Sequence, residues 1–152
     1  MEVKVVPYEV EGWGVGELYF VDERLVHHEL PKTGSAESGD HPLVRRLAAY
    51  FSGDPVSFED VELDLEWMTP FQRAVADTLR AVPYGETVTY GELAALAGHP
   101  NAYRAAGSFC ARNRFPLFLP CHRVVAADGL GPYGSLGTGY KRRLLELEGA
   151  PV

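Results

Sequence analysis

The sequence predicts an α+β protein of two units: a small α+β unit over residues 1–68 and a mostly helical unit over residues 69–152. The first half contains short segments of strand-like apolar alternation, whereas apolar residues recur at helical spacing from Thr69 onward. The charge changes at the same place: residues 1–68 carry 5 Lys or Arg and 15 Asp or Glu, and residues 69–152 carry 9 and 6. A total of 152 residues suffices for one good core or two small units packed together.

The elements of the first half follow from apolar alternation and turn residues. Pro42–Phe51 has apolar residues at helical spacing, which predicts a helix. Tyr8–Gly14 is predicted as a turn-rich connector, and residues 32–41, rich in Gly, Ser and Asp, as a loop. The predicted strands are Val3–Val6, Gly16–Val21, Arg24–Leu30 and Val61–Leu65.

Capping residues mark the helices of the second half. Thr69 precedes Pro70, an N-cap followed by proline at the first helical position, and residues 83–85 (Pro-Tyr-Gly) end that helix. Thr89 with Glu92 three residues later forms a capping box for a helix over residues 90–97. A last helix is expected over residues 140–149.

Two of these short helices are typical of a helix-turn-helix. A Gly-containing turn follows residue 97, and Asn101 is expected to cap a second helix over residues 102–112. In such motifs the second helix enters the DNA groove, and here it carries Arg104 and Arg112. Many helical hairpins bind nothing, so the pattern alone leaves a purely structural hairpin open.

Residues 120–125 (Pro-Cys-His-Arg-Val-Val) predict a reactive cysteine. Cys121 follows the apolar run of residues 115–119 and precedes two basic residues, and nearby His or Arg lowers the pKa of a thiol. The alternative for an isolated cysteine is a small buried apolar side chain. Cys110 is expected to be such a core residue, and the basic run of residues 141–143 a solvated helix face.

Composition excludes several classes of protein. Two cysteines provide neither a disulfide framework nor a zinc-binding set, and residues 1–68 offer only histidines, so we expect no metal and no cofactor. No apolar run approaches the length of a transmembrane helix, and the N-terminus lacks the layout of a signal peptide. We therefore expect a cytoplasmic protein without a membrane partner, associated with the nucleoid through DNA.

The second half resembles the O6-alkylguanine-DNA alkyltransferases, from about Thr69 to Gly149. The segments that carry the resemblance agree with the family in order and spacing. They are residues 83–90 (PYGETVTY), 103–107 (YRAAG), Asn113, residues 120–125 (PCHRVV) and residues 144–149 (LLELEG). The resemblance implies a ribonuclease H-like first unit, followed by a winged helix-turn-helix-like domain that binds DNA and carries the catalytic residues.

The resemblance also implies catalytic roles. Cys121 would take the alkyl group from guanine O6 irreversibly, once per molecule, and O4-alkylthymine is a possible second substrate. His122 would pull the thiol proton through a bound water toward Glu148, a nucleophile, a base and an orienting carboxylate. Tyr90 would hydrogen-bond guanine N3, and Asn113 would hold the turn before the active-site segment.

DNA contacts and an alkyl pocket follow from the same resemblance. The expected partner is alkylated double-stranded DNA. The protein would bind it as a monomer, in the minor groove and without sequence preference. Base extrusion is expected because the alkylated oxygen lies inside the base stack, and Arg104 would fill the gap. The other residues assigned to DNA contact are Tyr90, Ala105, Gly107 and Arg123, and those assigned to the substrate pocket are Pro120, Val124, Tyr133 and Ser135.

The chain departs from the family pattern at several positions. Ala106 replaces a valine, Tyr103 stands where a small residue is more common, and Arg114 stands where proline is usual. The loop of residues 133–137 (YGSLG) also differs, which leaves the preferred alkyl group open. Two other classes remain: a protein that only binds alkylated DNA, which the presence of Cys121 opposes, and a cysteine hydrolase, for which no oxyanion-hole motif is evident.

Overall fold

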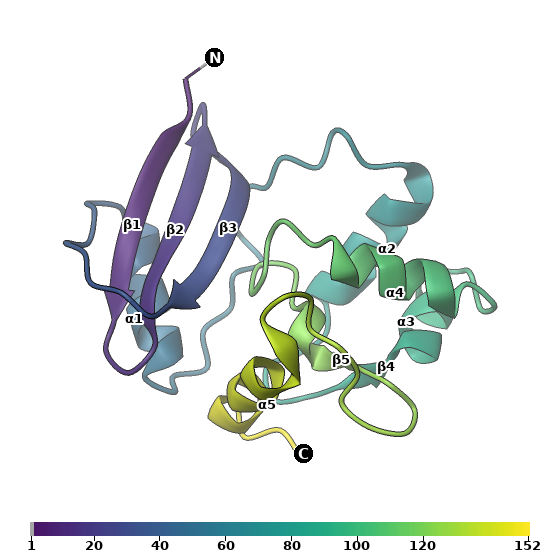
Figure 1. Ribbon diagram of the computed structural model, residues 1–152. Coiled ribbons are helices and arrows are strands. Elements are labelled where there is room, and N and C mark those ends of the chain that lie inside the picture. Colours follow the sequence, from purple (N-terminus) through teal and green to yellow (C-terminus); the bar gives the residue numbers. More distant parts are fainter. Residues whose placement is uncertain (1) are drawn as a thin grey trace. The chain divides into compact units, whose positions relative to one another are not determined.

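The N-terminal part of the chain folds as a three-stranded antiparallel sheet with one helix against it (Figure 1). The computed structural model describes residues 2–152. The strands β1 (Lys4–Val10), β2 (Gly14–Val21) and β3 (Arg24–Lys32) lie in chain order, and α1 spans Pro42–Phe51. Alternate residues of the strands face the buried side of the sheet, as a half-buried sheet requires.

The described chain divides into two units, and the division is not a single cut. Unit 1 holds the chain up to Asp64 together with Arg114–Pro116, and unit 2 holds Leu65–Asn113 and Leu117–Val152. The sequence placed one boundary after residue 68 and gave no sign that three residues from the second half belong with the first. Residues 114–116 come directly before the segment that carries Cys121.

A tyrosine–histidine pair crosses the sheet of unit 1. Tyr8 on β1 faces Gly16 on β2, and the Tyr8 hydroxyl lies 2.5 Å from His28 Nε2 on β3. The two rings stack with centroids 5.8 Å apart. A Cβ at Gly16 would lie 2.4 Å from Tyr8 Cζ, so glycine is what allows the ring to cross the central strand.

Unit 2 is mostly helical, and its short parallel strand pair ties two distant segments together. Val88 and Thr89 of β4 (Val88–Thr89) pair with β5 (Val124–Val125). This pairing places the residue that caps the next helix, Thr89, beside the chain that follows Cys121. The remaining elements are α2 (Pro70–Arg80), α3 (Tyr90–Leu96), α4 (Tyr103–Ala111), the 3₁₀ turn η1 (Cys121–Arg123) and α5 (Gly137–Leu147).

The predicted helix starts are confirmed where a side chain caps the helix. Thr69 accepts a hydrogen bond from the backbone of Gln72, and Thr89 from that of Glu92; each forms a full capping box. The prediction for Asn101 is wrong, because α4 begins after Ala102 and has no side-chain cap.

One strand prediction and one connector prediction in the first half were also wrong. Val61–Leu65 forms no strand and makes only an isolated bridge between Leu63 and Leu25, although its leucines are buried. Tyr8–Gly14 is not a connector, because β1 continues to Val10 and the turn occupies only residues 11–13. Alternation alone does not distinguish a buried extended segment from a paired strand.

Among residues 2–152, no helix is long and apolar enough to cross a membrane.

We predict that Gly16→Ala lowers the free energy of unfolding by about 1–3 kcal/mol, because the added methyl group overlaps the Tyr8 ring. Gly34→Ala is the matched control, since a Cβ there would meet its nearest atom, Val15 Cγ2, at 3.7 Å. Urea denaturation of the two variants measures the difference. Equal midpoints would show that Tyr8 does not occupy the space above Gly16.

Candidate functional site

Cys121 is buried at the start of the 3₁₀ turn η1. Its side chain and those of the next two residues are buried, and its backbone N–H donates to the Leu119 carbonyl over 2.7 Å. Burial raises the pKa of the Cys121 thiol well above its ordinary value, and a hydrogen bond with Cys110 raises it further. A hydrogen bond with Asn113 and the charge of Lys141 act in the opposite direction. The thiol is therefore protonated at rest and needs an adjacent base to react.

Glu148 joins three segments of unit 2 that are far apart in sequence. Its Oε2 lies 2.6 Å from His122 Nε2, and both carboxylate oxygens accept from Arg123, at 2.9 Å from Nε and 3.0 Å from Nη2. The backbone N–H of Gly85 donates to Oε1 over 3.1 Å. Burial alone would raise the pKa of Glu148, but the hydrogen bonds and charges of His122 and Arg123 outweigh it and hold that pKa far below its usual range.

The Glu148 contact determines which nitrogen of His122 carries the proton. An ionised carboxylate can only accept, so Nε2 is protonated and Nδ1 of the neutral ring carries a lone pair. Burial lowers the pKa of His122, and although the Glu148 contact raises it, the net shift is downward. His122 is therefore a neutral imidazole next in sequence to Cys121, and the Glu148 carboxylate orients its ring.

The Arg123 side chain is buried within unit 2, whereas the sequence analysis expected it to contact DNA. Besides its two bonds to Glu148, its Nη1 donates to the Val82 carbonyl over 2.8 Å, and its guanidinium lies over the Tyr84 ring. The side chain is only 10% exposed. Three of the five guanidinium N–H groups donate to Glu148 and Val82 in this buried position, so in this structure Arg123 supports Glu148.

Asn113 holds the backbone just before the nucleophile. Its Nδ2 donates to the Leu119 carbonyl over 2.8 Å, two residues before Cys121. The family resemblance implies that Asn113 holds the turn before Cys121, and this hydrogen bond is a contact through which it could do so.

Two tyrosines and a lysine lie near the two thiols. Burial raises the pKa of Tyr90 to about 12, and the charges of Cys110 and Cys121 add to the shift. Burial also raises the pKa of Tyr133 well above its usual value, and the charge of Cys121 is the next largest contribution. The Lys141 ammonium lies 5.6 Å from the centre of the Tyr90 ring and donates to the Pro132 carbonyl over 3.2 Å.

Lys141 and Cys110 lie close to Cys121, although the sequence analysis did not assign either residue to the site. Lys141 is completely buried, and burial lowers its pKa to about 8, whereas the sequence predicted a solvated face for residues 141–143. Cys110, on α4, hydrogen-bonds with the Cys121 thiol and is only partly buried, so it is more than a core residue. One signal was available for Lys141: it lies three residues before the buried Leu144, on the same face of α5.

The helix pair α3 and α4 presents the residues assigned to DNA. Arg104 and Ala105 are exposed at the start of α4, and Arg104 lies over the half-exposed ring of Tyr103. Gly107 lies one turn further, where a Cβ would be 3.9 Å from the Tyr90 ring. The predicted pocket residues are divided: Pro120 and Val124 are buried, Tyr133 is partly exposed and Ser135 is exposed.

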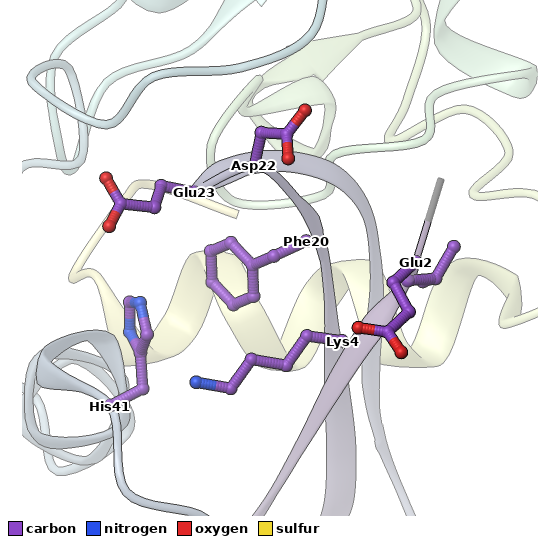
Figure 2. A pocket seen from close by; sticks show the side chains of 7 residues that line it. Glu2, Lys4, Phe20, Asp22, Glu23 and His41 are labelled. Carbon is purple, nitrogen blue, oxygen red and sulfur yellow. The ribbon is translucent and has the colours of Figure 1, made fainter.

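Unit 1 contains a separate pocket of about 690 Å³ that includes none of these residues. Figure 2 shows Phe20 in the middle of the lining side chains, with His41, Lys4 and three carboxylates around it. Phe20 and His41 stack with centroids 4.5 Å apart. Among residues 2–152 no group of three or more His, Cys, Asp or Glu side chains could hold a metal ion.

Comparison with known proteins identifies the family. The model of the 6-O-methylguanine DNA methyltransferase DNA-binding domain matches residues 70–150, which contain Cys121, His122 and Glu148. The chain belongs to this family. It is 50% identical over 111 residues to the methylated-DNA–protein-cysteine methyltransferase of Methanopyrus kandleri, covering 72% of this chain and 81% of the relative.

Solved structures of family members match across both units. The O6-methylguanine methyltransferase of Mycobacterium tuberculosis superposes with a TM-score of 0.79 at 35% identity, covering 98% of this chain and 96% of that one. The structure of M. tuberculosis OGT in complex with DNA has a TM-score of 0.75 at 38% identity, covering 91% and 90%. The mixed α+β architecture is therefore that of the family.

We predict that Glu148→Gln lowers the free energy of unfolding by about 3 kcal/mol, because it leaves the buried Arg123 guanidinium without a counter-charge. The control is Glu146→Gln, an exposed carboxylate on the same helix.

The lowered pKa of Glu148 also means that its stabilisation is present above pH 4.5 and is lost progressively as the pH falls below that value. Urea denaturation at pH 7 and pH 4 measures both effects, and equal stability of the two variants would contradict the buried ion pair.

Proposed function

We propose that this chain repairs O6-alkylguanine in duplex DNA by moving the alkyl group irreversibly to its own Cys121, once per molecule. The observation that carries the proposal is a buried thiol followed in sequence by a histidine that Glu148 orients, within a domain that matches the family's DNA-binding domain. O4-alkylthymine is a possible second substrate.

The proton path starts at the Cys121 thiol. His122, which is neutral with its lone pair on Nδ1, takes the thiol proton through a bound water, and the resulting imidazolium is stabilised by Glu148. The Lys141 ammonium favours the thiolate electrostatically. Deprotonation thus occurs only when the site is assembled, which suits a thiol that is protonated at rest.

The transfer step is a displacement at carbon. The thiolate forms the S–C bond while the C–O6 bond breaks, and the electron pair of that bond passes to the guanine. Tyr90 donates a hydrogen bond to guanine N3 as the leaving base gains charge, and its raised pKa keeps the hydroxyl protonated. The guanine leaves as an anion stabilised by this hydrogen bond and takes up a proton from water, which balances the proton that the thiol gives to His122. The thioether has no route back.

Delivery of the base requires extrusion from the stack. We propose that α3 and α4 act as a winged helix-turn-helix in the minor groove, with Ala105 and Gly107 permitting close approach and Arg104 filling the vacated space. The net charge of +3 over residues 69–152 supports sequence-independent phosphate contacts. Unit 1, with its sheet and single helix, corresponds to the ribonuclease H-like domain of this proposal.

The alkyl pocket would be formed by residues on both sides of Cys121. Pro120 and Val124 supply buried apolar surface, and the loop that carries Tyr133 and Ser135 would close over the alkyl group. We propose that the protein acts as a monomer in the cytoplasm.

Intact mass spectrometry after incubation with a short duplex containing one O6-methylguanine tests the proposal. The expected result is a gain of about one methylene group per molecule, located on Cys121 by peptide mapping and absent in Cys121→Ala. Binding without a mass gain would favour a protein that only senses alkylated DNA. Repeated turnover on a soluble ester would favour a hydrolase, and neither binding nor transfer would refute the assignment.

We predict that Gly131→Ala lowers the rate of methyl transfer roughly tenfold to a hundredfold, because a Cβ there would lie 3.3 Å from the Tyr90 hydroxyl and displace it. Gly129→Ala in the same loop meets nothing within 4 Å and is the steric control. Gly53→Ala reproduces the positive φ without a contact and controls for backbone strain. Single-turnover kinetics measures the rates, and equal rates for all three variants would refute a role for Tyr90 position.

A further inference from the structure

The backbone just before Cys121 contains a strained residue. Leu117 has φ of 73° and is buried, whereas the other non-glycine residues with positive φ among residues 2–152 are Asp22 and Glu23 in the β2–β3 hairpin turn. A left-handed conformation costs a leucine roughly 1–2 kcal/mol, so the surrounding structure must impose it.

Hydrogen bonds hold the chain on both sides of Leu117. On the far side, Asn113 Nδ2 holds the Leu119 carbonyl. On the near side, His28 makes two hydrogen bonds to residues 114–116. Its backbone N–H donates to the Arg114 carbonyl over 2.8 Å, and its ring Nδ1 lies 2.7 Å from the Pro116 carbonyl.

The His28 ring has only one arrangement of protons that satisfies its partners. The Pro116 carbonyl can only accept, so Nδ1 carries the hydrogen and donates. Nε2 then accepts from the Tyr8 hydroxyl. Burial lowers the pKa of His28 to about 4, although the bond to Pro116 opposes the shift, so the ring is neutral at physiological pH. Tyr8 thus selects the tautomer that can hold Pro116.

The sheet is built to bring these two side chains together. Tyr8 and His28 lie on the two outer strands, both almost fully buried, and Gly16 leaves the space through which the Tyr8 ring crosses the middle strand. Burying polar groups such as the Tyr8 hydroxyl and the His28 ring costs free energy, and apolar residues would fill the same core without that cost. The pair also requires a glycine in the strand between them.

We propose that Tyr8 and His28 are positioning residues for the acceptor thiol: they hold the Pro116 carbonyl and thereby impose the left-handed turn at Leu117 that sets the path of the chain to Cys121. This inference rests on the proposed function and assigns unit 1 a part in the transfer step. Neither residue touches the substrate; each acts through the backbone of residues 114–121.

The test compares three variants of the full chain. His28→Leu removes the ring donor to Pro116 and is expected to lower the rate of methyl transfer at saturating DNA about tenfold, with the Kd for DNA unchanged. His28→Asn retains a donor near the position of Nδ1 and is expected to recover a substantial part of that rate. Tyr8→Phe keeps the ring but loses the hydroxyl, and is expected to fall between wild type and His28→Leu.

Tyr50→Phe is the matched control, because Tyr50 is as deeply buried in unit 1 and lies on α1 against Phe51 and Phe58. All rates are measured well below the melting temperature of the least stable variant. Wild-type rates in His28→Leu, an equal loss in Tyr50→Phe, or no recovery in His28→Asn would each overturn the proposal.

A second measurement separates this proposal from the proposed function. The rate at which iodoacetamide alkylates Cys121 without DNA, followed by peptide mapping, is expected to change in His28→Leu and not in Tyr50→Phe. If wild type transfers no methyl group but this difference persists, the function is refuted and the positioning role stands. If wild type transfers and the Cys121 reactivities are equal, the positioning role is refuted.

Discussion

The carboxylate of Glu148 is the interaction on which the geometry of unit 2 depends. It accepts from a turn glycine, from His122 and from Arg123, so one side chain at the end of α5 holds the segment of residues 83–85 and the segment of residues 121–123. Burying it is tolerable because its charge is matched by a guanidinium and its oxygens are satisfied by hydrogen bonds. The same contacts that stabilise the fold orient the base next to the nucleophile.

A protonated, buried thiol is consistent with single use. Burial of Cys121 protects it from solution electrophiles, because the thiolate is the reactive form and burial opposes its formation. The Asn113 hydrogen bond and the Lys141 charge lower the pKa of this thiol, and the proposal assigns its deprotonation to His122. Under the proposed function, each molecule would react once with a base delivered into the site, so a low resting reactivity of the thiol would suffice.

Local sequence features predicted the local structure well. The capping residues Thr69 and Thr89 and the helix at residues 42–51 are determined within a few residues of chain. The sequence expected the basic residues next to Cys121 to lower its pKa, whereas burial raises that pKa, so the reactivity of Cys121 stays a prediction. The burial of Lys141 and Arg123 could not be predicted, because it depends on which segments pack against them, and both appeared in the sequence as ordinary basic residues. The return of residues 114–116 to unit 1 likewise depends on His28, which is more than 80 residues away.

The central claim is that Glu148 orders the protons of His122, and ¹⁵N NMR of ring-labelled histidine tests it most directly. At pH 7 the account predicts a neutral His122 with a protonated Nε2 and an unprotonated Nδ1, and predicts that Glu148→Gln disturbs this pattern while Glu146→Gln does not. A His122 protonated on Nδ1, or doubly protonated in the resting protein, would contradict its role as the base that takes the proton of Cys121.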